Sequence, residues 1–309
     1  MIPSLIIIAG PTGIGKTETV LKLAEPLGAE VINADSMQVY KRMDIGTAKP
    51  TPEEQARVRH HMIDVVEPDE PFNAAQFREM AEPIIHGLHS AGKPVFVAGG
   101  TGLYIKVLTQ GVFPCPEGSE EIRQELKADA DALGSEALFN RLQAVDPESA
   151  ASIHPNDTYR IVRALEVFEL TGRPFSEHHN AHRFKDIPYR TLKIALTMDR
   201  AILYERIEQR VDRMLKQGLL DEVQGLLDDG FSPDLESMQS IGYSHAVKLL
   251  RGELSFDEMV RTLKRDTRRY AKRQFTWFKA DPGMTWLEPG ETDHMRKMVD
   301  VFLESFRSS

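Results

Sequence analysis

A glycine-rich segment near the N-terminus has the residue types needed to bind phosphate. Residues 10–17 read GPTGIGKT and match the pattern G-x-x-x-x-G-K-[ST]. Glycines let backbone N–H groups turn toward an anion, Lys16 adds a positive charge, and the Thr17 hydroxyl can bind Mg²⁺. An apolar run precedes the segment and a helical stretch follows it, so a simple turn is the weaker alternative. We expect a di- or triphosphate site formed by Gly10, Pro11, Thr12, Gly13, Ile14, Gly15, Lys16 and Thr17.

Two further polar segments follow apolar runs in the same way. Residues 33–40 read NADSMQVY and residues 99–104 read GGTGLY. Because ligands of open parallel sheets lie beyond the carboxyl ends of the strands, both segments are expected near the phosphate site. Asp35 could act as a general base or hold Mg²⁺ through water, or it could merely cap the following turn. Thr101 could orient a ligand, or it could belong to a tight strand-to-helix turn.

Short apolar runs are expected to form the sheet that positions these segments. The strand-like runs are 5–9, 30–34, 94–98, 192–197 and 285–287, and helical stretches at 16–27 and 73–90 separate the first of them. Strands that alternate with helices predict right-handed crossovers and a parallel sheet. The expected fold class is therefore α/β, with a core like that of the P-loop NTPases.

The middle of the chain has a different character. Between about residues 111 and 188 the strand-like runs disappear, and helical periodicity dominates at 120–133, 135–144 and 157–170. Pro114 and Pro116 bound this segment at one end, and the loop 184–188 bounds it at the other. We expect a core domain made of 1–112 and 189–309, with C-terminal helices, and a helical insertion domain at 113–188.

Composition excludes several classes of protein. Of the 309 residues 41% are hydrophobic and 28% are charged, which is typical of a globular protein, and no apolar run approaches the roughly 20 residues that span a bilayer. Cys115 is the only cysteine, so a disulfide framework and a cysteine-based zinc site are excluded and a cytoplasmic location is expected. His60-His61 and the group His178, His179 and His182 lack a recognised metal-binding spacing.

The charge distribution leaves room for a nucleic acid partner. The net charge of −9 argues against a polyanion, but residues 261–273, RTLKRDTRRYAKR, hold seven basic side chains and one acidic one. On a helix one face would carry Arg261, Arg265, Arg268, Arg269 and Lys272, and the opposite side would carry Leu263, Tyr270 and Trp277. We expect the basic face to contact phosphates, although a solvated cationic face is the usual alternative.

Six segments taken together resemble a known family. They are GPTGIGKT (10–17), NADSMQVYKRMDIGTAKP (33–50), VAGGTGLY (97–104), IHPNDTYRIVRALE (153–166), IGY (241–243) and AKRQFTWF (271–278). In this order they closely resemble the bacterial tRNA dimethylallyltransferases, also called tRNA isopentenyltransferases, of the IPP transferase family. DSMQVY followed by MDIGTAKP is the most specific part. The chain departs from relatives at Gly13-Ile14-Gly15, where small residues are common, and at Ser244-His245, where a basic residue is common.

The resemblance implies a reaction. It is the transfer of a dimethylallyl group from dimethylallyl diphosphate to the exocyclic amine of the adenosine on the 3′ side of the anticodon, in tRNAs that read codons beginning with U. The phosphate loop would bind the donor's diphosphate with Mg²⁺ held near Thr17, Asp35 would accept the proton of the amine, and Thr101 would lie near the reacting groups. An arginine on the helix 204–215 would hold the diphosphate: Arg210, or Arg206 as the second choice, although either could be a solvated helix position.

The resemblance also implies tRNA contacts. They fall on Asp35, Ser36, Met37, Gln38, Thr101, Arg123, Tyr159, Arg160, Ile161, Val162, Arg163 and the loop Ser240, Ile241, Gly242, Tyr243, Ser244 and His245. Arg160 and Arg163 share one face of a helix, where they could instead be an exposed pair with Glu166. The anticodon stem-loop of tRNA and dimethylallyl diphosphate would be the partners of a cytoplasmic monomer that needs no membrane.

Two other function classes fit the sequence less well. A phosphate-loop kinase of small molecules or nucleosides would use ATP, but it would not need the basic C-terminal helix or the helical insertion. A GTPase-like switch would carry a guanine-specificity motif such as N-K-x-D, which is not recognisable in the sequence.

Overall fold

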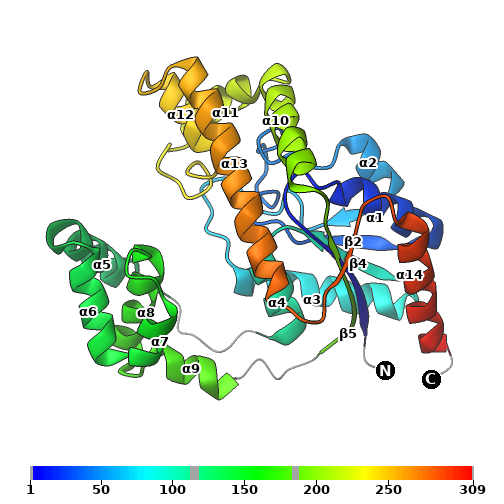
Figure 1. Cartoon of the computed structure of the whole chain (residues 1–309), viewed down its shortest axis with the longest axis horizontal. Coiled ribbons are helices and arrows are strands. Elements are labelled where there is room, and N and C mark those ends of the chain that lie inside the picture. The colour runs from blue at the N-terminus through cyan, green and yellow to red at the C-terminus, as the bar shows by residue number, and fades with distance from the viewer. Residues whose placement is uncertain (1–2, 112–117, 183–187, 308–309) are drawn as a thin grey trace. The chain divides into compact units, whose positions relative to one another are not determined.

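The computed structural model describes residues 3–111, 118–182 and 188–307. The chain forms two compact units, one made of Met1–Thr109 with Pro188–Ser309 and the other made of Gln110–Ile187 (Figure 1). The second unit covers nearly the same residues as the predicted insertion, 113–188. Cys115, its two flanking prolines and residues 184–187 of the predicted boundary loop lie outside the described residues.

A parallel sheet of six strands forms the centre of the first unit. Its order is β3 (His60–His61), β2 (Glu30–Asn33), β4 (Val95–Gly99), β1 (Ser4–Ala9), β5 (Arg190–Leu196) and β6 (Thr285–Leu287). The five predicted strands and the α/β class are confirmed. Strand β3 was missed because its two histidines form no apolar run.

The register of the central strands brings the predicted polar segments to one edge of the sheet. Ala9 lies opposite Gly99 in the β1–β4 pair, and Asn33 lies opposite Ala98 in the β2–β4 pair. The three strands therefore end together, and the segments that follow them start side by side. This is the edge at which ligands of such sheets bind.

The helices of the first unit are α1 (Lys16–Ala24), α2 (Pro52–Arg57), α3 (Ala74–Ser90), α4 (Gly102–Gln110), α10 (Arg200–Lys216), α11 (Leu219–Asp228), α12 (Tyr243–Leu250), α13 (Phe256–Lys279) and α14 (Thr292–Arg307). The predicted helix 16–27 ends earlier as an α-helix, and Glu25–Leu27 form a 3₁₀ turn because Pro26 lacks a backbone N–H. Asn73 caps α3 by accepting hydrogen bonds from the Ala75 and Gln76 N–H groups.

Two apolar clusters hold these elements together. One packs α1 and α14 against the sheet and includes Ile8, Val20 and Met295. The other joins the segment after β2 to helices α10–α13 and includes Met43, Val211 and Leu263. The second cluster fixes the walls above the polar edge of the sheet.

The second unit is helical throughout its described part. Its helices are α5 (Glu120–Leu133), α6 (Ser135–Val145), α7 (Pro147–Ser152), α8 (Thr158–Thr171) and α9 (Phe175–His182). The three predicted helices are confirmed to within a residue at each end, and Asp157 caps α8 through the Arg160 N–H. Leu126, Leu142 and Ile161 are buried in its own small core.

Candidate active site

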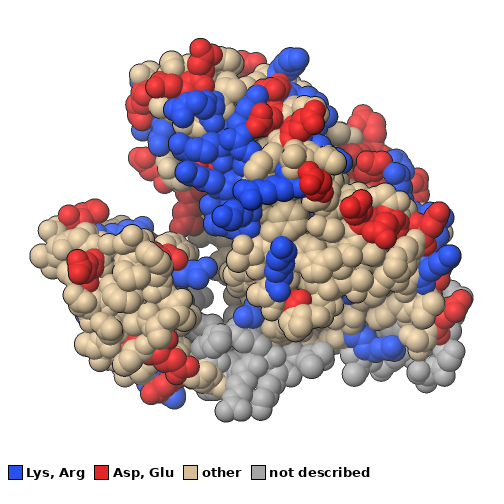
Figure 2. All heavy atoms as spheres, in the orientation of Figure 1, with Lys and Arg blue, Asp and Glu red and all other residues tan. Residues whose placement is uncertain are grey.

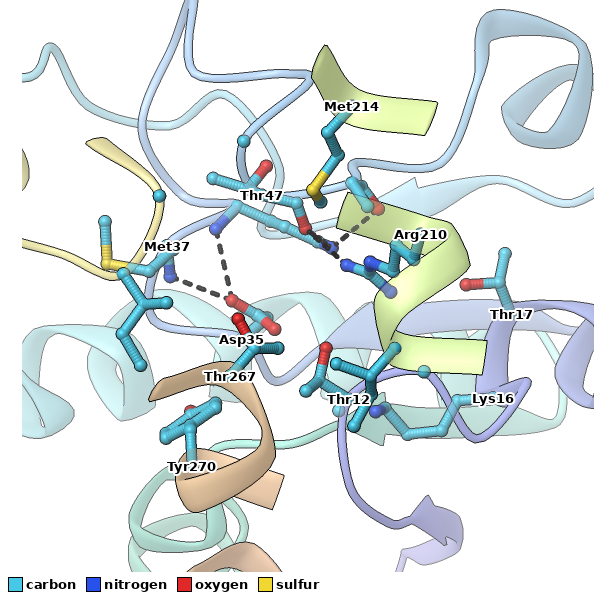
Figure 3. A pocket seen from close by; sticks show the side chains of 18 of the residues that line it. Thr12, Lys16, Thr17, Asp35, Met37, Thr47, Arg210, Met214, Thr267 and Tyr270 are labelled. Carbon is cyan, nitrogen blue, oxygen red and sulfur yellow. Dashed lines mark hydrogen bonds between the residues drawn. The ribbon is translucent and has the colours of Figure 1, made fainter. Parts of the chain in front are cut away.

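A pocket of about 860 Å³ lies at the carboxyl ends of the strands of the first unit (Figure 3). Its walls come from the phosphate loop, the segments 33–38 and 46–50, helix α10 and helix α13. Polar and charged side chains of distant parts of the chain project into it, among them Lys16, Asp35 and Arg210. The predicted phosphate loop and the predicted base therefore share one cavity.

The phosphate loop has the backbone geometry of an anion site. Gly13 and Gly15 have φ values of 80° and 103°, which residues other than glycine rarely adopt. Helix α1 begins at Lys16, so its N-terminal N–H groups face the loop. The Lys16 Nζ donates hydrogen bonds to the Gly10 and Pro11 carbonyls, each at 3.0 Å. The ammonium is thus held over the loop, where it can meet a phosphate oxygen.

The pKa of Lys16 reflects its surroundings. This pKa is lowered to about 8, mainly because the ammonium is buried and also because of the positive charge of Arg210. The carboxylate of Asp35 acts in the opposite direction. The three groups therefore sense one another's charge across the pocket.

Asp35 is held by its own backbone. Its Oδ1 accepts hydrogen bonds from the N–H groups of Met37 at 2.9 Å and Gln38 at 3.4 Å. The capping alternative is therefore correct for this oxygen. Among the described residues no hydrogen bond to Oδ2 is present, so one oxygen orients the carboxylate and the other can accept a proton. Capping through Oδ1 is thus compatible with a base at Oδ2, and the role of Asp35 as the base stays a prediction.

Thr101 joins two loops. Its Oγ1 accepts a hydrogen bond from the Ser36 N–H at 2.9 Å, and its backbone N–H donates to the Ala34 carbonyl at 3.1 Å. A Cβ on Gly99 would lie 2.0 Å from the Ala34 oxygen, so these two segments of the chain approach too closely for any side chain at position 99. Thr101 lies behind the residues that line the pocket, and direct contact with reacting groups stays a prediction.

Arg210 and Arg206 both line the pocket, one turn apart on α10. Arg210 donates a hydrogen bond from Nη2 to the Thr47 carbonyl at 3.3 Å, and burial lowers its pKa while Asp35 opposes that effect. Arg206 lies beside the phosphate loop, because a Cβ on Gly15 would be 3.3 Å from its Nη2. The two arginines thus lie beside the loop and Asp35; Arg210 is half-buried, whereas Arg206 is exposed, and the choice between them stays a prediction.

A half-buried carboxylate that the sequence did not reveal fixes the segment between Asp44 and Gly46. Glu222 Oε2 accepts the N–H groups of Asp44 and Ile45 at 2.9 and 2.8 Å, and Oε1 accepts the Gly46 N–H at 3.1 Å. The Tyr243 hydroxyl donates to the same carboxylate at 2.5 Å, which together with burial raises the pKa of this tyrosine. The sequence of α11 is that of an ordinary amphipathic helix, so no local signal indicated this role.

Gln274 also escaped the sequence analysis as a site residue, although it lies in the AKRQFTWF segment. Its side chain on α13 is buried and bonds both to the phosphate loop and to the turn after β4. The neighbouring Tyr270 lines the pocket as well, and burial is the main cause that raises its pKa.

The predicted tRNA contacts of the first unit divide into two groups. The first group lines the pocket and consists of Asp35, Ser36, Met37, Gln38, Ser240, Ile241, Gly242 and Tyr243. The predicted loop 240–245 is wrong in its second half, because α12 begins at Tyr243. The side chain of Tyr243 is 1% exposed and packs over Gly46, where a Cβ would lie 2.4 Å from its ring. Ser244 and His245 lie on the first turn of α12, beside Arg265 and Asp266 in a shallow groove.

The predicted contacts of the second unit also divide. Ile161 and Val162 are 0% and 4% exposed and pack in its core, which disfavours contact through their side chains; their predicted tRNA contact stays a prediction. Arg123 and Arg163 form ion pairs with the fully buried Glu166 at 3.0 and 2.5 Å. The pairing with Glu166 given as the alternative for Arg163 is therefore present. Arg160 pairs instead with Asp157 at 3.4 Å, and Tyr159 is 77% exposed.

The basic face of α13 is visible as a group of Lys and Arg over that helix (Figure 2). Several of its cations have acidic neighbours: Arg265 and Arg269 bind Asp266 at 2.8 and 3.5 Å, and Arg268 pairs with Glu208. Leu263 is buried on the opposite side as predicted, but Trp277 is 39% exposed because only one part of its ring covers Gly102.

The paired histidines have structural partners. His61 Nε2 lies 2.7 Å from Glu30 Oε2, His60 Nδ1 lies 2.7 Å from the Val58 carbonyl, and His178 Nε2 lies 3.2 Å from Thr171 Oγ1. The side chains of His179 and His182 lie outside the described residues. Within the described ranges no three His, Cys, Asp or Glu side chains come together as metal ligands, and no helix is long and apolar enough to cross a bilayer.

The fold and the pocket define a phosphate-loop α/β protein with a helical insertion. A family model described as IPP transferase matches residues 38–281, and the chain belongs to this family. The chain is 54% identical to a tRNA dimethylallyltransferase of Syntrophobacter fumaroxidans over 93% of this chain and 84% of that relative. It is 53% identical to a tRNA dimethylallyltransferase of Geobacter metallireducens over 96% of this chain and 97% of that relative.

Solved structures agree with these relatives. The tRNA isopentenylpyrophosphate transferase from Bacillus halodurans has a TM-score of 0.73 and 41% identity, with 98% of this chain and 97% of that chain covered. A eukaryotic dimethylallyltransferase acting on tRNA has a TM-score of 0.76 and 29% identity, with 93% of this chain and 74% of that chain covered.

Proposed function

We propose that this protein transfers a dimethylallyl group from dimethylallyl diphosphate to the exocyclic amine of the adenosine on the 3′ side of the anticodon, in tRNAs that read codons beginning with U. The observation that carries this proposal is the single pocket that holds a phosphate loop, two arginines and an oriented aspartate. The relatives named as tRNA dimethylallyltransferases support it.

The donor side of the pocket suits a departing diphosphate. In the reaction the bond between the allylic carbon and the diphosphate oxygen breaks, and negative charge develops on the leaving group. Loop N–H groups, Lys16, Arg206 and Arg210 supply donors and positive charge where that charge forms. Thr17 lines the same pocket and would hold a Mg²⁺ ion, which would add further positive charge beside the diphosphate.

The acceptor side suits a weak nucleophile. The adenine amine has a lone pair that is delocalised into the ring, so it must lie close to the allylic carbon and lose a proton as the N–C bond forms. Asp35 Oδ2 accepts that proton in our proposal, because Oδ1 is committed to Met37 and Gln38.

The acceptor base must leave the anticodon loop and enter the pocket. The basic face of α13 would bind backbone phosphates near the pocket, since Arg273 on the same helix lines the pocket. Arg123, Arg160, Arg163 and Tyr159 of the insertion are proposed tRNA contacts as well. Because tRNA is the proposed acceptor, we place the enzyme in the cytoplasm, and we propose that it acts as a monomer.

A labelling experiment tests the reaction against the kinase alternative. Purified protein is incubated with dimethylallyl diphosphate labelled in the allyl group, unmodified tRNA and Mg²⁺, and parallel reactions contain labelled ATP instead. We expect label in the tRNA, located on the adenosine next to the anticodon, and much slower labelling with Asp35→Asn. Phosphoryl transfer or ATP hydrolysis without any tRNA labelling would instead support a kinase.

A further inference from the structure

We infer that Gln274 is a positioning residue that fixes the phosphate loop and the Asp35 segment relative to each other. This inference rests on the proposed function, because the two segments form the donor and acceptor sides of one reaction. Gln274 itself touches neither reacting atom in the proposal. It would act through the backbone of the loops that it joins.

Both polar groups of the Gln274 amide are used between two loops. Oε1 accepts a hydrogen bond from the Thr12 N–H at 2.8 Å, and Nε2 donates to the Gly100 carbonyl at 2.9 Å. The side chain is 6% exposed, so water does not replace these bonds easily. An amide combines a donor and an acceptor at one side-chain end, which suits a bridge between an N–H and a carbonyl.

The contact with Gly100 continues to Asp35 through the next residue. The Thr101 N–H donates to the Ala34 carbonyl at 3.1 Å, and Thr101 Oγ1 accepts the Ser36 N–H at 2.9 Å. Asp35 lies between these two anchored neighbours. The bonds form one continuous path from the loop after β1, through Gln274 and the turn after β4, to the loop after β2.

The space around the bridge permits little adjustment. A Cβ on Gly100 would lie 2.3 Å from Gln274 Nε2, and a Cβ on Gly99 would lie 2.0 Å from the Ala34 oxygen. The bridge also turns the Thr12 N–H toward α13. Anion binding in the loop therefore relies on other groups of the loop, and the Thr12 N–H serves to anchor the loop instead.

Two substitutions separate this role from simple packing. Gln274→Met keeps the length of the side chain but leaves the Thr12 N–H and the Gly100 carbonyl without their partner. Gln274→Glu keeps the acceptor for Thr12 and sets an oxygen against the Gly100 carbonyl. Phe278→Leu is the matched control, because Phe278 is 1% exposed on the same side of α13, one turn further on, and serves packing alone.

The first measurement is the single-turnover rate of prenyl transfer at saturating substrates. Displacing reacting groups by about 1 Å can cost ~10²-fold in rate. We expect both Gln274 variants to lose about 10- to 100-fold. Their affinities for tRNA and for inorganic diphosphate should stay within about threefold of the unaltered protein, as a geometric defect does not remove a ligand contact. Phe278→Leu, matched in thermal stability, should keep the rate.

The second measurement does not depend on the reaction. Hydrogen exchange is followed in peptides that cover residues 10–17, 33–38 and 99–102. In Gln274→Met we expect faster exchange in all three, including 33–38, which Gln274 does not contact; in Phe278→Leu we expect no such change. Unchanged exchange at 33–38 together with an unchanged transfer rate would overturn the inference. If the unaltered protein transfers no prenyl group, the proposed function fails, and the exchange pattern still decides whether Gln274 joins the loops.

Discussion

The two sides of the pocket are built in different ways. The phosphate loop is stabilised largely within itself, since Lys16 bonds to the carbonyls of Gly10 and Pro11 and the Ile14 N–H bonds to the Pro11 carbonyl. The segment after β2 combines bonds of its own, such as that from Gln38 Nε2 to the Thr47 carbonyl, with bonds to distant side chains. The N–H groups of Asp44–Gly46 donate hydrogen bonds to Glu222, which lies more than 170 positions away in the chain. The Thr47 carbonyl accepts a hydrogen bond from Arg210.

This difference separates what a loop does from what holds it. A loop that folds through its own backbone shows its geometry in a short motif, as GPTGIGKT does. The local sequence of a loop that is shaped by distant side chains reveals only the residues proposed to contact the ligand, and not the residues that hold the loop in place. Substitutions on the two sides should therefore fail in different ways: loss of chemistry or anion binding on one side, and loss of loop order on the other.

The largest effect is expected at the boundary of the two sides. Asp35→Asn removes the proposed proton acceptor and keeps the shape of the side chain, so kcat should fall by about 10²- to 10⁴-fold. Steady-state kinetics with labelled donor measures this, and binding of tRNA should remain. Asp44→Asn, an exposed carboxylate of the same segment that pairs with Lys49, is the control and should stay within about twofold. Turnover of Asp35→Asn equal to that of the control would remove Asp35 as the base.

A smaller effect is expected within the phosphate loop. Lys16→Met should weaken the binding of Mg²⁺-diphosphate by about 10²-fold, because a charge-assisted contact worth ~1.5–3 kcal/mol is lost. The pKa of Lys16 is lowered to about 8, so raising the pH from 7 to 9 neutralises the free enzyme's ammonium and weakens binding. Calorimetric titration at several pH values measures both. Lys16→Met also serves as the control for pH, because the diphosphate titrates in the same way with either protein. An equal pH dependence of the binding affinity in Lys16→Met and in the unaltered protein would contradict this role of Lys16.

In the segment after β2, substitution of a distant anchoring residue should disturb the order of the segment more than the chemical step. Glu222→Gln cannot accept all of the bonds from three backbone N–H groups and the Tyr243 hydroxyl, so kcat/KM should fall by about tenfold. Hydrogen exchange should accelerate in 43–49 and stay unchanged in 10–17. Glu205→Gln, an exposed carboxylate on α10, is the control. Faster exchange on both sides would erase the contrast between the two loops.

The smallest effect concerns the basic face of α13. Replacing Arg265, Arg268 and Arg269 by Ala should weaken tRNA binding several-fold and reduce the salt slope of log K by ~1–2, given about 0.7 per phosphate contact on single strands. The acidic partners of these arginines already offset part of their charge, which keeps the loss modest. The triple variant of Lys22, Lys41 and Arg57, which have acidic partners and do not themselves line the pocket, is the matched control. An identical salt slope in both triple variants would make the α13 face a solvated one.

The sequence predicted the sheet, its edge and many of the residues that line the pocket, because apolar runs and strand ends are local features. It did not predict Glu222, the packing of Tyr243 or the bridge made by Gln274. Each of these depends on a long-range hydrogen bond between residues 21 to 262 positions apart. Burial of Ile161 and Val162 likewise follows from how α8 packs on α5 and α6, which a family motif alone does not disclose.

The position of Trp277 provides an optical reporter of α13. Its indole covers Gly102 at the start of α4, and it is one of two tryptophans in the chain. Trp286, which stacks on Phe275, can be replaced by Phe to leave a single emitter. Fluorescence from that variant would then follow, in real time, whether arrival of RNA on one side of α13 alters the contact that its C-terminal end makes with the start of α4.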